Sequence, residues 1–246
     1  MSTLAGEVAA VRWIGVSDIE ELQRIACQRI LDAATHAIES RGRFVIVLSG
    51  GETPRGVYRM LRTARTDWSR WHVYFGDERC VPAGDAARNS TMACDEWLDH
   101  VPLPQPQVHA IPAALGATAA ARAYSETLRA LGDFDLVLLG LGEDGHTASL
   151  FAGHNWGIDP NAPDVLAVFD APKPPPQRVS MSAARLSRAR EVLFLVADTS
   201  KREALARWRS GAPLPAAAIR PAAGVDVLFE SSLLDHSTSL MSASSA

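Results

Sequence analysis

Short apolar segments without alternation recur along the chain and predict strands that are buried on both sides. They are FVIVL at 44–48, HVYF at 72–75, FDLVLL at 134–139, VLAVF at 165–169, EVLFLV at 191–196 and DVLF at 226–229. Continuous apolar character is typical of a parallel sheet that helices cover on both faces. Apolar residues at three- and four-residue spacing predict such helices at 19–38, 124–131 and 201–208. The pattern therefore predicts an α/β fold with a Rossmann-like, mainly parallel sheet and helices on both faces.

The length of 246 residues is enough to bury a large core, and α/β folds of this size are commonly one domain. We therefore expect a single α/β catalytic domain over residues 1–234. The remaining segment, DHSTSLMSASSA at 235–246, is rich in Ser and short in large apolar residues. It predicts a polar, flexible C-terminal tail.

Charge and cysteine usage narrow the class of protein. The formal net charge is −4, and Lys and Arg are scattered without a dense run, so nucleic acid is not an expected partner. Cys27, Cys80 and Cys94 form no CxxC pair, which favours reduced thiols. No apolar run approaches the ~18 residues that a membrane helix needs, and the N-terminus has no export signal. We expect a cytoplasmic protein that does not interact with membranes.

Glycine and polar residues follow each predicted strand directly. The segments are SGGETP at 49–54, GDER at 76–79, GLGEDGH at 140–146, DAPKPPPQR at 170–178 and ADTSK at 197–201. In an open parallel sheet, such loops emerge at the carboxyl edge and meet in one crevice. The sequence therefore predicts a ligand site there.

The first of these loops predicts an anion cradle. Gly50 and Gly51 allow a close backbone approach, and Thr53 and Pro54 are typical of an N-cap and a first helical position. Free N–H groups and the helix dipole favour phosphate at such a place, although Gly-Gly before a helix is also ordinary turn chemistry.

The basic residues after the strands are more ambiguous. Arg79 offers paired donors to phosphate or carboxylate, with Asp77 on sugar hydroxyls, but GDER could equally be a surface ion cluster. Lys201 stands where a helix starts, which is mildly unfavourable for a cation; a ligand role and an ordinary solvated lysine remain alternatives. Arg178, after the Pro-rich stretch, is open in the same way.

The loop GLGEDG at 140–145 matches the dinucleotide-binding pattern GxGxxG directly after a strand. A nicotinamide-dependent enzyme is therefore an alternative, with Asp170 as its ribose ligand. Glu143 and Asp144 argue against it, because they place two negative charges where a pyrophosphate would bind. His146 follows, and a histidine beside a carboxylate suits a general base; a cap of the following helix is the structural alternative.

Together these loops resemble the 6-phosphogluconolactonase family, in the wider group that includes glucosamine-6-phosphate deaminase. The resemblance rests on VLSGGETPRGVYRML at 47–61, FGDERCVP at 75–82, RNSTMA at 88–93, FDLVLLGLGEDGHTASLFAG at 134–153, PKPPPQRVSMS at 172–182 and the Lys201 segment. It implies a fold like that of ribose-5-phosphate isomerase and CoA transferases. It also implies hydrolysis of the phosphorylated sugar lactone 6-phosphogluconolactone in the oxidative pentose phosphate pathway, without an organic cofactor.

The resemblance also implies roles for single residues. His146 is the expected base that activates water, with Asp144 as its orienting partner, and Arg79 and Lys201 are the expected cations for phosphate or the oxyanion. The further implied substrate contacts are Ser49, Gly50, Gly51, Thr53, Asp77, Asn89 and Arg178.

Three alternatives remain beside the lactonase. A deaminase typically places a glutamate shortly after the shared DGH segment, where this chain has HTASLFAG at 146–153. The dehydrogenase and a non-catalytic sugar-phosphate binder are the others. No GxSxG elbow and no metal-ligand spacing occurs, so covalent serine catalysis and metal chemistry lack support. A monomer or small homo-oligomer is expected.

Overall fold

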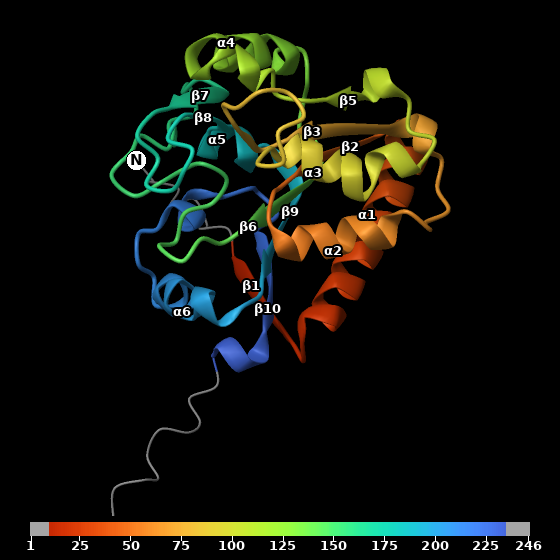
Figure 1. Ribbon diagram of the computed structural model, residues 1–246. Helices are drawn as coiled ribbons and strands as arrows, with labels where there is room; N and C mark the ends of the chain where they lie inside the picture. The colour runs from red at the N-terminus through yellow and green to blue at the C-terminus, as the bar shows by residue number, and fades with distance from the viewer. Residues whose placement is uncertain (1–9, 235–246) are drawn as a thin grey trace, which may run out of the picture.

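A seven-stranded, entirely parallel sheet forms the centre of the molecule. The computed structural model describes residues 10–234, and the strand order is β1-β10-β9-β6-β2-β3-β5 (Figure 1). The bounds are β1 (Val11–Val16), β2 (Phe44–Leu48), β3 (Trp71–Phe75), β5 (Val108–His109), β6 (Phe134–Gly140), β9 (Ala189–Val196) and β10 (Val225–Glu230). Every residue of β2 is buried, as expected for a strand covered on both faces. The predicted α/β fold with a mainly parallel sheet is confirmed.

Six α-helices accompany the described strands. They are α1 (Ile19–Arg41), α2 (Glu52–Leu61), α3 (Asn89–Glu96), α4 (Ala117–Leu128), α5 (Ala183–Ser187) and α6 (Arg202–Arg209). Short 3-10 helices also occur at Trp68–Arg70, Leu98–His100, Gln105–Gln107, Ala113–Leu115, Thr199–Lys201, Pro215–Ala218 and Ser231–Leu233. No helix in residues 10–234 is both long and apolar enough to span a membrane.

Helices α1 and α6 cover opposite faces of the sheet. Trp208 of α6 packs edge-on against Trp13 and Phe194, with centroids 5.2 and 4.7 Å away. Arg29 of α1 instead pairs with Asp226, the residue before Val227, which is in register with Trp13 and Phe194. Since successive strand residues point to opposite faces, α1 lies on the other side, as Figure 1 also shows.

The first helix illustrates how local sequence sets the ends of these elements. Asp18 accepts a hydrogen bond from the Glu21 N–H at 2.8 Å, which satisfies one of the unpaired N–H groups of the first turn. Gly42 ends the helix at φ 75°, in the left-handed conformation that glycine adopts readily. Between them, an apolar stripe faces the sheet.

A second, antiparallel sheet has the order β4-β8-β7, with β4 (Asp77–Arg79), β7 (Val165–Val168) and β8 (Arg178–Met181). The placement of 165–169 in the parallel sheet is therefore wrong. An apolar run does not specify its partner, and β7 pairs with the nearby β8 across the Pro-rich connection. The predicted tail at 235–246 lies outside the described residues.

Candidate functional site

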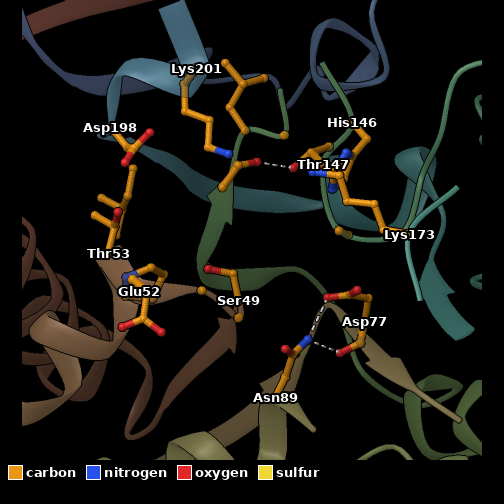
Figure 2. A pocket seen from close by; sticks show the side chains of 18 of the residues that line it. Ser49, Glu52, Thr53, Asp77, Asn89, His146, Thr147, Lys173, Asp198 and Lys201 are labelled. Atoms are coloured by element: carbon orange, nitrogen blue, oxygen red, sulfur yellow. Dashed lines mark hydrogen bonds between the residues drawn. The ribbon is translucent and has the colours of Figure 1, made fainter. Parts of the chain in front are cut away.

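The loops after β2, β3, β6 and β9 meet at the carboxyl edge of the sheet around a cleft of about 470 Å³. Ten of the eleven residues expected at the site line it. They are Ser49, Gly50, Gly51, Thr53, Asp77, Arg79, Asn89, His146, Arg178 and Lys201. Figure 2 shows His146, Lys173 and Lys201 across the cleft from Ser49, Asp77 and Asn89. The eleventh, Asp144, does not line the cleft but forms a hydrogen bond with His146, which does.

His146 is held by a tight turn that follows β6. Its Nδ1 lies 2.5 Å from Asp144 Oδ1, and the Gly142 N–H donates to the His146 carbonyl at 2.7 Å. Burial alone would raise the pKa of Asp144, but its hydrogen bonds with His146 outweigh burial and hold that pKa below its ordinary value. An ionised carboxylate only accepts, so the imidazole proton lies on Nδ1. The neutral ring then has an unprotonated Nε2, which is the atom that a base needs.

The glycines of this turn have a cause other than nucleotide binding. A Cβ on Gly142 would lie 2.0 Å from His146 Nδ1, and Gly145 has φ +90°. Gly142 therefore lets the imidazole lie close against its own turn, and Gly145 supplies the positive φ of that turn. A dinucleotide site would need a helix directly after residue 146, but the next helix in the described chain begins at Ala183, and Asp170 follows a strand of the other sheet. The same fact removes the alternative in which His146 caps a helix.

The first loop places the N-terminus of α2 at the cleft. Gly51 is the N-cap residue, at φ 110° and ψ 167°, and the helix begins at Glu52. The predicted N-cap at Thr53, with Pro54 at the first helical position, is therefore wrong by two residues, because glycine reaches a backbone conformation that other residues rarely adopt. Ser49 lies at the same place, and its buried Oγ has no hydrogen-bond partner among residues 10–234.

Asp77 and Asn89 form a buried polar pair beside this loop. Asn89 Nδ2 donates to the Asp77 carbonyl and to Asp77 Oδ1, both at 3.0 Å, and Ser149 Oγ donates to Asp77 Oδ2 at 2.6 Å. A Cβ on Gly50 would lie 1.9 Å from Asn89 Oδ1. The pair therefore ties the first loop, the GDER segment and the residues after His146 to one another.

Glu78, between the two predicted contact residues, has a structural task. Its carboxylate is fully buried at the N-terminus of α3. It accepts from the N–H groups of Arg79, Asn89 and Ser90 and from Ser90 Oγ, at 2.7 to 2.9 Å. A carboxylate at a helix N-terminus with several donors is a stable arrangement. The acids of GDER are thus not a surface cluster.

The two arginines are already engaged with the backbone. Arg79 Nη1 donates to the Ala87 carbonyl, and its buried Nε has no partner among the described residues. Arg178 is 4% exposed and donates to the carbonyls of Lys173, Pro174 and Pro175. Burial lowers the pKa of Arg178. Arg178 therefore anchors the Pro-rich segment, and its role as a substrate contact stays a prediction.

The two lysines of the cleft share one acid. Lys173 Nζ lies 3.2 Å from Glu143 Oε2, and Lys201 Nζ lies 3.6 Å from Glu143 Oε1. Lys173 was not among the expected site residues, although its loop PKPPPQR was identified as one that follows a strand. The positive charge of Lys173 in a loop that follows a strand was the sequence signal that could have identified it.

Comparison with known proteins agrees with this geometry. The model of the glucosamine-6-phosphate isomerases/6-phosphogluconolactonase family matches residues 17–228. The chain belongs to this family. A 6-phosphogluconolactonase of Mycobacterium leprae is 37% identical over 222 residues, which cover 85% of this chain and 88% of that protein.

Solved structures with this fold include enzymes named for two different reactions. The crystal structure of 6-phosphogluconolactonase from Thermotoga maritima superimposes with a TM-score of 0.83 at 26% identity, over 90% of this chain and 100% of that one. A monomeric glucosamine-6-phosphate deaminase reaches 0.77 at 22% identity, over 91% and 98%. Because both fit, the reaction must be argued from the site.

Proposed function

We propose that this protein hydrolyses 6-phosphogluconolactone to 6-phosphogluconate; relatives at 37% and 38% identity are named 6-phosphogluconolactonase. The observation that carries the proposal is the hydrogen bond between Asp144 and His146 Nδ1 beside a cleft that also contains cations. A positioned base and anion-binding groups are what hydrolysis of a phosphorylated lactone requires.

In the proposed reaction, a water gives its proton to His146 Nε2 while its oxygen attacks the lactone carbonyl. The imidazolium that forms is stabilised by Asp144. Collapse of the tetrahedral intermediate breaks the bond to the ring oxygen, which takes the proton back from Nε2. A lactone is an activated ester, so no covalent enzyme intermediate is needed.

We assign the anionic end of the substrate to two elements that line the cleft, the N-terminus of α2 and Lys201. The N-terminal N–H groups of α2 have no intrahelical partners and lie beside the buried Oγ of Ser49. Lys201 lies at the start of α6, where its ammonium group reaches the same cleft. We place the phosphate between these two elements, with Arg79 available to either the phosphate or the oxyanion.

Deamination is the second candidate, because a deaminase shares the fold. We favour hydrolysis because the residues after His146 supply no acid. Thr147 Oγ1 donates to the Gly140 carbonyl at 2.8 Å, and Ser149 Oγ donates to Asp77. The glutamate that a deaminase typically has shortly after the DGH segment has no counterpart in TASLFAG at 147–153.

The test is the rate of acid production from freshly made 6-phosphogluconolactone, corrected for spontaneous opening. We expect turnover, and we expect His146→Ala to lower kcat by about 10²- to 10⁴-fold, the usual contribution of a general base. His154→Ala is the matched control, since His154 is exposed and outside the cleft. Release of ammonia from glucosamine-6-phosphate would instead indicate the deaminase. Binding of the lactone without turnover would indicate a non-catalytic binder.

A further inference from the structure

Glu143 makes an unusual set of contacts for a residue of the turn that carries the base. Its carboxylate pairs with Lys173 from the Pro-rich segment and with Lys201 from the start of α6. Within residues 10–234, neither lysine has another acid within 4.0 Å. One carboxylate thus pairs with the ammonium groups of two residues that line the cleft.

Stability does not account for this arrangement. The side chains of Glu143 and Lys173 are 52% and 49% exposed, and ion pairs at such exposure contribute little to folding. The turn is instead fixed by backbone hydrogen bonds within residues 142–146. The position of the Glu143 carboxylate is therefore free to change without moving His146.

We propose that Glu143 is a resident anion of the phosphate subsite, which the phosphate of the substrate displaces from Lys173 and Lys201. This inference rests on the proposed function and adds Lys173 as a second phosphate-binding cation. A dianionic phosphate and a carboxylate repel each other at the same pair of ammonium groups, so one must leave. Glu143 is the one that can, because its half-exposed side chain can turn into water without burying its charge.

This competition would act on phosphorylated ligands alone. An unphosphorylated lactone has no charge with which to displace Glu143, so the lysines stay paired. The phosphate of a phosphorylated substrate replaces the Glu143 carboxylate at the two lysines. The free energy needed to remove that carboxylate lowers the apparent affinity of the protein for the phosphorylated substrate. Removing the Glu143 charge should then tighten the binding of phosphate. If Glu143 only held the two lysines in position, its removal would weaken that binding.

The experiment compares wild type, Glu143→Gln and Glu126→Gln. Glu126 is the matched control, because it is 54% exposed and pairs with Arg129, three residues later in the sequence. It lies on α4 and does not line the cleft. Inorganic phosphate binding is measured by calorimetry, and KM and kcat are measured for phosphorylated and unphosphorylated gluconolactone. In Glu143→Gln we expect phosphate Kd and the KM of the phosphorylated lactone to fall by about threefold to tenfold. The KM of the unphosphorylated lactone should not change, nor should any value in Glu126→Gln.

A second variant tests the role of Lys173. Adding Lys173→Ala to Glu143→Gln should remove the gain in phosphate affinity. Unchanged or weaker phosphate binding in a folded Glu143→Gln protein would overturn the inference. If neither protein hydrolyses the lactone but phosphate still binds more tightly to Glu143→Gln, the proposed function fails and the subsite stands.

Discussion

Replacement of Asp144 by Asn is the sharpest test of the proposed base. The variant keeps the shape of the side chain and an oxygen for the turn, which accepts from the His146 N–H at 3.2 Å. It removes the charge beside Nδ1. If the amide nitrogen instead takes the place of this oxygen, it donates to Nδ1, which puts the ring proton on Nε2 and blocks that atom. We therefore expect kcat to fall while the fold is retained.

The magnitude follows from the distance and the exposure. With Nδ1 and Oδ1 2.5 Å apart, the charge centres of an imidazolium and the carboxylate are about 4 Å apart. Their attraction is about 1 kcal/mol in water and about 4 kcal/mol near a protein surface. Asp144 is 41% exposed and His146 17%, so screening reduces the upper value and about 2–3 kcal/mol remains. The expected loss in kcat is about 30- to 150-fold.

The assay is the initial rate of acid formation at saturating lactone, with KM measured in parallel. KM should change by less than about threefold, since Asp144 does not line the cleft. Asp159→Asn is the control, because Asp159 also accepts from the N–H two residues later, at 2.7 Å, but outside the cleft. A kcat for Asp144→Asn within threefold of wild type would refute the reasoning.

Three further predictions concern the turn, the phosphate and the stability of the fold. Gly142→Ala should displace the imidazole, because its Cβ would lie 2.0 Å from the ring, and activity should fall at least tenfold in a folded protein; Gly132→Ala, with open space around its Cβ, should retain activity. Lys201→Ala should raise the KM of the phosphorylated lactone about tenfold or more and leave that of gluconolactone unchanged, and an equal change for both substrates would exclude phosphate recognition. Glu96→Gln should lower Tm by about 2–4 °C at pH 7. The pKa of Glu96 lies below its ordinary value, chiefly because of the hydrogen bond with Arg59. The stabilisation by the Glu96 carboxylate is therefore complete at a pH above the ordinary pKa. It is lost as the pH falls through the lower pKa of the folded state. Thermal denaturation at pH 7 and pH 3 measures this, and an equal Tm difference at both would contradict it.

The strands of the central sheet were the most predictable part of the fold. Five of the six apolar runs identified lie in it, because a strand buried on both faces is apolar at most positions. Strand β1 was missed, since VRWIGV mixes Arg12 and Gly15 into an edge strand with only one neighbour. Helix α4 was expected at 124–131 and found at Ala117–Leu128, because its alanine-rich first turns carry little apolar contrast.

The site was predictable as far as topology determines it. Parallel strands bring their carboxyl ends together, so residues after four strands could be expected in one cleft. The role of each residue was less accessible. Glu78 and Asn89 belong to one buried hydrogen-bond network at the N-terminus of α3. Asn89 lines the cleft and Glu78 does not, and the sequence pattern does not distinguish these two roles.

The neighbouring acids Glu143 and Asp144 show what a sequence pattern leaves out. In the sequence they are two equal negative charges, whose joint effect is to repel an anion from the turn. In the structure they point to different cations, since Asp144 pairs with the imidazole and Glu143 with the two lysines. An incoming phosphate would thus compete with one acid and leave the other in place. The two lysines can therefore bind an anion while the turn keeps its base oriented, because the two carboxylates have different partners.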